Sequence, residues 1–268
     1  MRTEEVSSAS NPKFKKLLAL QEKSSLRRSE GLFVVEGRRE IENMLQAGFI
    51  PETLFLCPEV FPAPERLLEK ASAANPGLLA VEIPRALYAK AAYREGTEGV
   101  IAEVRCRDLK LEDLQPGENP LIVVLESVEK PGNLGAVLRS ADAAGADAVV
   151  ICDPLTDLYN PNLLRASLGA AFTVPCVACT SGEAIAWLKS RGIRILTAQL
   201  QDSSLYYDVP MTGGTAIVMG TESTGLTDEW RRAADAHIRI PMLGTLDSLN
   251  VSVSAAILLF EAVRQRQG

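Results

Sequence analysis

Short apolar runs alternate with amphipathic stretches along most of the chain. In the N-terminal part, the apolar runs are typical of strands, and the stretches between them repeat apolar residues at helical spacing. The expected strands are 31–37, 53–57, 78–83 and 99–104, and the expected helices are 38–48, 64–74 and 84–92. This pattern predicts a small α/β domain.

The same alternation continues in the C-terminal part, where the apolar runs are more continuous. Strands are expected at 121–128, 147–153, 193–200, 215–220 and 238–242, and helices at roughly 134–145, 160–170, 182–191, 227–236 and 253–266. Nearly unbroken Val, Ile and Leu predict a parallel sheet that helices cover on both faces. Ligands of such sheets bind beyond the carboxyl ends of the strands.

A polar, charged segment that contains Pro116 and Gly117 separates the two parts. We therefore predict an N-terminal α/β domain at 1–106, a linker at 107–119 and a larger α/β domain at 120–268.

The chain has 268 residues, of which 47% are hydrophobic and 23% charged, and this composition is typical of a globular protein. No apolar run reaches the ~20 residues that cross a bilayer, and we expect no signal peptide because the first residues lack an apolar segment. Five cysteines are too few and too scattered for a disulfide framework, so we expect a cytoplasmic protein.

The net charge of −6 argues against a protein that coats nucleic acid non-specifically, but residues 11–40 carry a local charge of +4. The basic residues of this segment are Lys13, Lys15, Lys16, Lys23, Arg27, Arg28, Arg38 and Arg39. By charge alone they form either an RNA-binding surface or an ordinary solvated helix face.

Polar residues follow three of the expected strands. Asn133 and Arg139 follow the first, Glu222 follows the fourth, and Ser248 and Asn250 follow the fifth. Neither a dinucleotide fingerprint nor a P-loop is present, and each group alone could be a turn or a helix cap. Together they would lie at one edge of the sheet.

Three segments resemble, in order and spacing, the signature motifs of the SpoU (TrmH-type) family of RNA ribose 2′-O-methyltransferases in the SPOUT superfamily. They are "NLGAVLRSADAAGAD" (133–147), "VMGTESTGL" (218–226) and "IPMLGTLDSLNVSVSAAILLFEA" (240–262). The resemblance implies a parallel-sheet SPOUT domain with a trefoil knot, an N-terminal domain that binds RNA, S-adenosylmethionine as cofactor, and a homodimer. It implies neither a metal nor a membrane.

The resemblance also assigns residues to roles. Its catalytic or substrate-positioning residues are Asn133, Arg139, Glu222, Ser248 and Asn250, and its cofactor-binding residues are Gly220, Ile240, Leu249 and Met242, with Thr197 and Ala198 beside them. We expect RNA contacts from Arg27, Arg28, Arg38, Arg39, Arg94 and Arg165.

Two patterns admit other interpretations. Leu249, Val251 and Val253 alternate with polar residues and so predict a strand, whereas the resemblance implies a loop that passes into the last helix. The cysteines of "CVAC" (176–179) would point to opposite faces of an extended segment, so we expect no metal there. His237 is the only histidine, and we expect a packing or surface role rather than a catalytic base.

Two alternatives remain at this level. One is a non-catalytic RNA-binding or ribosome-assembly protein on the same fold, which the intact polar motifs argue against. The other is a nucleotide-dependent oxidoreductase, which lacks support because the glycine fingerprint is absent. The resemblance favours ribosomal RNA over tRNA as substrate, because an N-terminal domain of this size is commoner among family members that act on large ribosomal RNA.

Overall fold

The computed structural model describes residues 1–93, 98–221 and 224–267. The chain divides into two compact units, which we call the N-terminal unit (Met1–Arg107 with Tyr159–Leu164) and the C-terminal unit (Asp108–Leu158 with Arg165–Gly268). The predictions made at Arg94 and Glu222 lie outside the described residues.

The N-terminal unit is built on a mixed sheet with strand order β1-β4-β3-β5-β2. Strand β5 runs antiparallel to both of its neighbours, whereas β1, β4 and β3 are parallel. The strands are β1 (Arg2–Glu5), β2 (Leu32–Glu36), β3 (Pro51–Leu56), β4 (Leu79–Glu82) and β5 (Val100–Arg105). Strand β1 was not predicted, because its four residues are polar and exposed.

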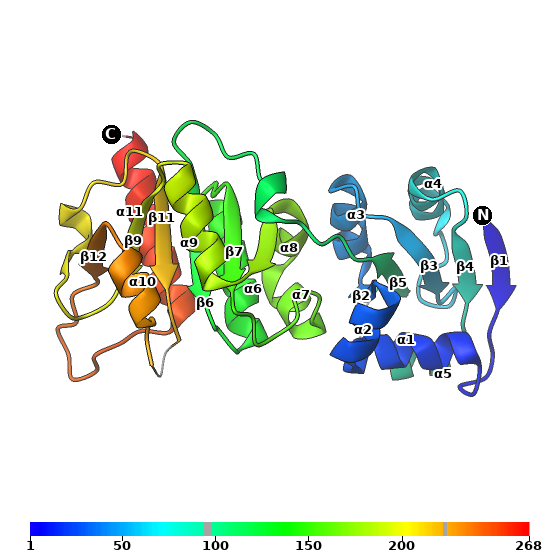
Figure 1. Ribbon diagram of the computed structural model, residues 1–268. Coiled ribbons are helices and arrows are strands. Elements are labelled where there is room, and N and C mark those ends of the chain that lie inside the picture. The colour runs from blue at the N-terminus through cyan, green and yellow to red at the C-terminus, as the bar shows by residue number, and fades with distance from the viewer. Residues whose placement is uncertain (94–97, 222–223, 268) are drawn as a thin grey trace. The chain divides into compact units, whose positions relative to one another are not determined.

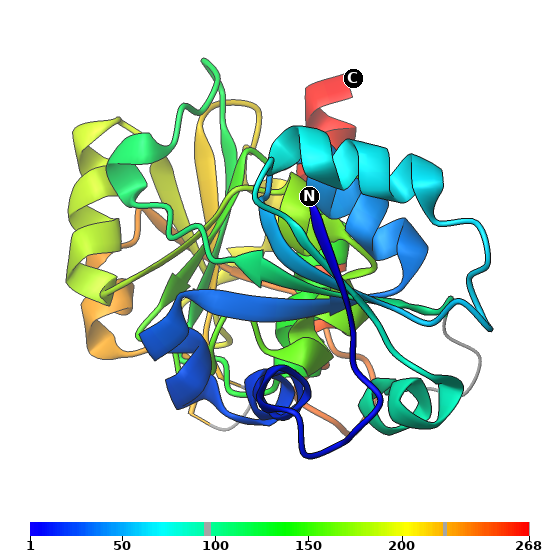
Figure 2. The ribbon, with the colours of Figure 1, turned by 90° about the vertical axis from the view of Figure 1, so that its right-hand side faces the viewer.

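Helices cover both faces of this sheet, with α3 and α4 on one face and α1, α2 and α5 on the other (Figures 1 and 2). Phe14, Leu17 and Leu20 on one side of α1 are fully buried in a core that they share with α5. The helices are α1 (Pro12–Glu22), α2 (Ser24–Glu30), α3 (Arg38–Gln46), α4 (Glu65–Ala74) and α5 (Arg85–Ala91).

The C-terminal unit contains a parallel sheet with strand order β10-β12-β9-β11-β6-β7-β8. Its central strands are buried along their whole length, as their apolar sequences predict. The strands are β6 (Leu121–Glu126), β7 (Ala148–Cys152), β8 (Cys176–Cys179), β9 (Arg194–Ala198), β10 (Ser204–Leu205), β11 (Thr215–Met219) and β12 (Ala236–Arg239).

Helices α9 and α10 lie in front of this sheet in Figure 1, and α6 and α11 lie behind it. Trp230 of α10 and Leu188 of α9 pack on the same face of β6 as Ile122 and Val124. The helices of this unit are α6 (Pro131–Ala143), α8 (Ala170–Thr173), α9 (Ser181–Ser190), α10 (Asp228–Ala233) and α11 (Val251–Gln267). Helix α7 (Pro161–Ser167) is divided between the two units, because residues 161–164 belong to the N-terminal unit and residues 165–167 to the C-terminal unit.

The predicted linker packs as part of the C-terminal unit. Leu111 and Leu114 are buried in the core beneath α9, and Leu109 forms a bridge with Val177 of β8. These leucines recur every two or three residues within an otherwise polar segment, which explains why part of it docks on the domain.

The strand predicted from the alternation at 249–254 does not form. Helix α11 begins at Val251, and its buried residues Val251, Ala255, Leu258 and Leu259 follow helical spacing. Asn250 begins the helix, because its backbone carbonyl accepts hydrogen bonds from the N–H groups of Val253 and Ser254. The loop and helix implied by the resemblance are therefore found, while the trefoil knot stays a prediction.

Candidate active site

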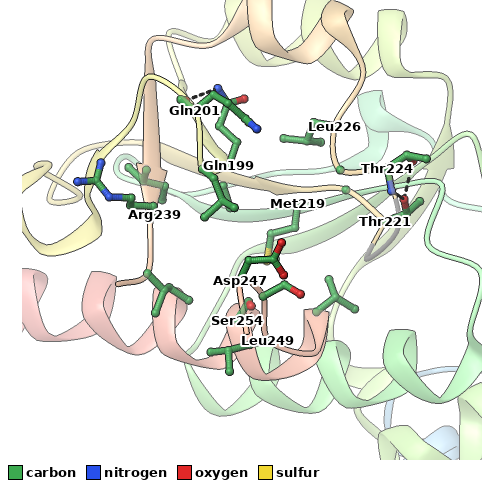
Figure 3. Close-up of a pocket in the computed structure, with 18 of the residues that line it drawn as sticks. Gln199, Gln201, Met219, Thr221, Thr224, Leu226, Arg239, Asp247, Leu249 and Ser254 are labelled. Atoms are coloured by element: carbon green, nitrogen blue, oxygen red, sulfur yellow. Dashed lines mark hydrogen bonds between the residues drawn. The ribbon is translucent and has the colours of Figure 1, made fainter. Parts of the chain in front are cut away.

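A pocket with a volume of about 330 Å³ lies beyond the carboxyl ends of β9, β11 and β12 (Figure 3). Its described walls come from 198–201 after β9, from 219–221 and 224–226 after β11, from Arg231 on α10, and from 238–240, Met242, 247–249, Val251 and Ser254 around β12 and the start of α11. Segments distant in sequence thus meet where a parallel sheet places its ligand.

Most of the residues predicted to bind the cofactor line this pocket. They are Ala198, Gly220, Ile240, Met242 and Leu249, and the predicted catalytic residue Ser248 lies among them. Their roles stay predictions that this placement supports.

Thr197 does not line the pocket. Its side chain is fully buried, and its hydroxyl lies 2.6 Å from Nδ1 of His237. The two residues are register partners on β9 and β12, which explains why their side chains meet. Successive side chains along β9 point to opposite faces of the sheet, so the side chain of Thr197 points away from that of Ala198. Thr197 could therefore contact a ligand in the pocket only through its backbone atoms. His237 has the packing role that we predicted, as this contact indicates.

Gly220 allows the loop after β11 to close upon itself. A side chain at this position would lie 2.3 Å from the carbonyl oxygen of Gly225, so only glycine fits without moving backbone. The loop is closed by the Gly225 N–H, which donates to the Thr221 carbonyl at 3.0 Å, and by a 2.7 Å contact between the hydroxyls of Thr221 and Thr224. Backbone groups therefore form this wall of the pocket.

The pocket fits S-adenosylmethionine in its chemistry. Met219, Leu226 and Ile238 provide apolar surface for a purine, and two polar groups are left for a ligand. Oε1 of Gln199 and Nε of Arg231 are buried and have no hydrogen-bond partner within the part of the chain that the structure describes. The Gln199 amide is oriented by its Nε2 group, which donates to the Gln201 carbonyl at 2.9 Å (Figure 3). The motifs included neither residue; for Gln199, its position directly after a buried strand was the available signal.

The fold joins two of the predicted catalytic residues. Nδ2 of Asn250 donates to Oδ1 of Asn133 at 3.1 Å, although 117 positions separate them in the sequence. Asn133 lies in the first turn of α6 and Asn250 directly precedes α11, and these two helices pack against each other. Arg139 is exposed on α6, six residues after Asn133, and its guanidinium has no hydrogen bond or ion pair with another described residue.

A buried polar network anchors the loop that leads into α10. Glu126, at the end of β6, is 3% exposed, and it accepts hydrogen bonds from the backbone N–H and the hydroxyl of Thr227 at 2.9 and 2.7 Å. The Ser181 hydroxyl donates to Asp153 at 2.6 Å and accepts from Nε1 of Trp230 at 2.9 Å. These bonds fix the start of α10 relative to the sheet and so shape one side of the pocket.

Comparison with known proteins gives the family. The model of the SpoU rRNA Methylase family matches residues 120–260, which is more than half of the chain. The chain belongs to the SpoU rRNA methylase family. A second family model, the MRM3-like substrate binding domain, matches residues 11–102.

The chain aligns over most of its length with proteins that are named as 23S rRNA methyltransferases. It is 40% identical to the 23S rRNA (guanosine-2′-O-)-methyltransferase RlmB of Photobacterium profundum, over 63% of this chain and 72% of that protein. It is 28% identical to the 23S rRNA (guanosine(2553)-2′-O)-methyltransferase RlmP of Bacillus subtilis, over 96% and 98%. Among solved structures, the AdoMet-bound rRNA methyltransferase from Sinorhizobium meliloti matches with a TM-score of 0.90, 31% identity and 98% coverage of both chains.

These findings confirm the family, the fold class, the enzyme class of RNA 2′-O-methyltransferase and the cofactor S-adenosylmethionine, all of which the three motifs predicted.

The arginines predicted to contact RNA differ in their placement. Arg28, Arg38 and Arg39 are exposed, and Arg165 is half-buried on α7. Arg27 is instead buried, because its Nη1 donates to the carbonyls of Leu20 and Gln21 at 2.6 and 3.2 Å at the end of α1. It therefore has a structural role in the N-terminal unit and does not belong to the RNA-binding set.

The cysteines in and beside β8 differ in their surroundings. Cys176 and Cys179 stand at the two ends of β8, and the Cys152 thiol is hydrogen-bonded to Cys179. Burial raises the pKa of Cys176 to about 12. Within 1–93, 98–221 and 224–267, no group of three or more His, Cys, Asp or Glu side chains could hold a metal ion. Over the same residues, no helix is both long and apolar enough to cross a membrane.

Proposed function

We propose that this protein transfers the methyl group of S-adenosylmethionine to the 2′-hydroxyl of a guanosine in large-subunit ribosomal RNA. The observation that carries this proposal is the Asn133–Asn250 contact in a family member whose predicted cofactor residues line one pocket. RlmB and RlmP, two of its relatives, are named for guanosine in 23S rRNA, and the substrate-binding domain model covers the N-terminal unit.

The bound cofactor supplies an electrophilic methyl group, so the residues of the chain mainly align the ribose oxygen and stabilise its developing charge. Arg139 suits the second task, because its exposed guanidinium has no partner among the described side chains and can bind an RNA phosphate in bidentate fashion. A guanidinium stays protonated at neutral pH and is therefore not a proton acceptor. We therefore assign Arg139 to RNA binding and charge stabilisation rather than to general base catalysis.

Asn133, Asn250 and Ser248 are suited to orient the ribose. The Asn133–Asn250 hydrogen bond fixes both amides, and Ser248 lies two residues before Asn250 in the wall of the pocket. The catalytic role predicted for Glu222 rests on the motif alone, because the residue lies outside the described part of the chain.

RNA binding by the N-terminal unit belongs to the same proposal. Arg28, Arg38 and Arg39 are exposed there, although Arg38 also lies 3.4 Å from a carboxylate oxygen of Glu42. Weak exposed ion pairs of this kind open readily for a phosphate. Arg165 remains a candidate in the C-terminal unit, and Arg94 lies outside the described residues.

A homodimer is also part of the proposal. Leu243 and Leu246 are 97% and 77% exposed in the loop before α11, and Val253 and Phe260 are exposed on that helix. An apolar surface of this kind, next to the pocket wall, suits a second copy of the chain. Sedimentation equilibrium would test it, and a strictly monomeric protein would contradict it. Action on ribosomal RNA and free cysteines favour a cytoplasmic location.

The decisive experiment maps 2′-O-methyl groups on ribosomal RNA from cells with and without the gene. We expect one guanosine of the large-subunit RNA to lose its methyl group. The wild-type gene should restore it, and a gene encoding Arg139→Ala should not. Loss of no methyl group, together with no transfer from labelled S-adenosylmethionine to ribosomal RNA in vitro, would favour the non-catalytic RNA-binding alternative.

A further inference from the structure

Arg231 is the least satisfied arginine near the cofactor pocket. It lies on α10 and lines the pocket, its Nε is buried, and that atom has no hydrogen-bond partner. The guanidinium makes no ion pair or side-chain hydrogen bond with any described residue. The neighbouring carboxylates of Asp228 and Glu229, on the same helix, do not pair with it.

Other described arginines that are buried or half-buried donate hydrogen bonds to protein groups. Arg27 donates to two carbonyl oxygens, and Arg266 donates to those of Met211, Asn119, Pro120 and Gly213. Burying a guanidinium donor without an acceptor is unfavourable, because the hydrogen bond to water is lost and nothing replaces it. An unpaired arginine in the wall of a ligand pocket therefore indicates an acceptor that the ligand brings.

The charges of the cofactor decide which acceptor this is. The adenosyl part is neutral and the sulfonium is positive, so the only anionic group is the carboxylate of the amino-acid part. A guanidinium fork matches a carboxylate in geometry and in charge. Of the other charged residues that line the pocket, Arg239 already donates to the Ser203 hydroxyl at 3.4 Å, and Asp247 is itself negative.

We propose that Arg231 binds the carboxylate of the amino-acid part of S-adenosylmethionine. The inference rests on the assignment of that cofactor to this pocket. Anchoring this end of the cofactor would restrict the sulfonium to one position relative to Asn133 and Asn250. Arg231 would then be a positioning residue that contacts the cofactor and not the RNA.

Two ligands that differ by the amino-acid part test the proposal. S-adenosylhomocysteine carries the carboxylate, and 5′-methylthioadenosine keeps the nucleoside and the thioether but lacks it. We would measure both dissociation constants by calorimetry for the full-length protein, for Arg231→Met and for Arg232→Met. Arg232, the next residue of α10, is exposed and does not line the pocket, so it controls for the loss of one positive charge.

Arg231→Met should weaken the binding of S-adenosylhomocysteine by about 10- to 100-fold, the size expected for a charge-assisted bidentate contact. It should change the binding of 5′-methylthioadenosine by less than about threefold. Arg232→Met should change neither. The melting temperature without ligand should stay the same or rise in Arg231→Met, because an unpaired buried donor is removed.

Three results would overturn the proposal. Equal weakening of the binding of both ligands would show that Arg231 contacts the nucleoside or only maintains the shape of the pocket. Unchanged affinity for S-adenosylhomocysteine together with weaker binding of RNA would show that Arg231 binds a phosphate of the RNA instead. A clear fall in the melting temperature without ligand would show a structural role. If the unmutated protein binds neither ligand, the cofactor assignment fails, and this inference fails with it.

Discussion

The side chain of Asn250 makes two kinds of hydrogen bond at once. Its Oδ1 accepts from the backbone N–H of Ser252 at 3.1 Å and thereby caps α11, while its Nδ2 donates to Asn133 at 3.1 Å. Capping stabilises the folded protein, and the hydrogen bond between the two amides orients the side chains of the candidate active site. At the scale of single residues, these two contributions can be separated.

Asn250→Asp keeps the acceptor that caps the helix but removes the donor to Asn133. We expect this variant to keep a melting temperature close to that of the parent protein and to lose about 2–4 kcal/mol of transition-state stabilisation, the scale of one preorganised polar group. Asn250→Ala should lose both the cap and the activity. Single-turnover methyl transfer and thermal unfolding measure the two effects. Normal turnover in Asn250→Asp would remove the Nδ2 group from the catalytic assignment.

Glu103 shows what an unsatisfied acid does to stability. It lies on the interior strand β5, 4% exposed, and its Oε1 has no hydrogen-bond partner among the described residues. Burial raises the pKa of this carboxyl above the ordinary value of 4.5. The folded protein therefore holds the proton more tightly than the unfolded chain does. The contribution of this group to stability is therefore fully present below pH 4.5 and is lost as the pH rises through the folded-state pKa.

Glu103→Gln should raise the melting temperature at pH 7, and this gain should shrink as the pH falls toward 4.5, where the parent carboxyl is protonated as well. Thermal unfolding between pH 4.5 and 8 measures the difference, with the exposed Glu5→Gln as control. A gain that does not depend on pH would contradict the role of the buried charge.

At the scale of elements, one carboxylate joins the end of β6 to the start of α10. Glu126 accepts two hydrogen bonds from Thr227, and the loop that ends at Thr227 forms a wall of the pocket. The position of the loop therefore depends on a residue that lies 101 positions away in the sequence.

Thr227→Val removes the hydroxyl that donates to Glu126 but keeps the backbone donor. We expect a loss of about 1.5–3 kcal/mol in unfolding free energy, the size for a hydrogen bond to a charged group, as measured by urea unfolding. Binding of S-adenosylhomocysteine should weaken as well, because the pocket wall loosens. Thr227→Ser keeps the hydroxyl and should have the unfolding free energy and the S-adenosylhomocysteine affinity of the parent protein. If it does not, the methyl group of Thr227 rather than its hydroxyl is responsible.

At the scale of the whole molecule, the arginines proposed to bind RNA and the pocket proposed to bind the cofactor lie in different units. The exposed arginines 28, 38 and 39 belong to the N-terminal unit, whereas the pocket belongs to the C-terminal unit. RNA affinity and cofactor affinity should therefore respond to different substitutions.

Replacing Arg28, Arg38 and Arg39 together by Gln should lower the log–log salt slope of RNA binding by about 2, at about 0.7 per lost phosphate contact on a single strand. The affinity for S-adenosylhomocysteine should not change. RNA titrations across a salt series measure the slope, and a charge-matched variant with Gln at Arg2, Arg66 and Lys90 serves as control. The same fall in slope in both variants would indicate a general charge effect without a defined RNA surface.

The sequence by itself determined the elements that rest on regular patterns. The central strands β6, β7 and β11 were predictable because they are buried on both faces and therefore apolar throughout. The motifs predicted the family and the cofactor, both of which are confirmed, because binding of one ligand restricts residue types at fixed spacings; the roles that the motifs assign to single residues stay predictions. Strands β1 and β10 escaped prediction, because short polar segments at sheet edges carry no apolar period.

Only the tertiary structure decided which side chains face one another. It buried Arg27 against carbonyl oxygens, turned Thr197 toward His237, joined Asn133 to Asn250 and left Nε of Arg231, in the pocket wall, without a partner among the described residues. The physical reason is the same in each case. These contacts depend on which face of a strand or helix meets a partner far away in the sequence, and a local period of two or 3.6 residues does not name that partner.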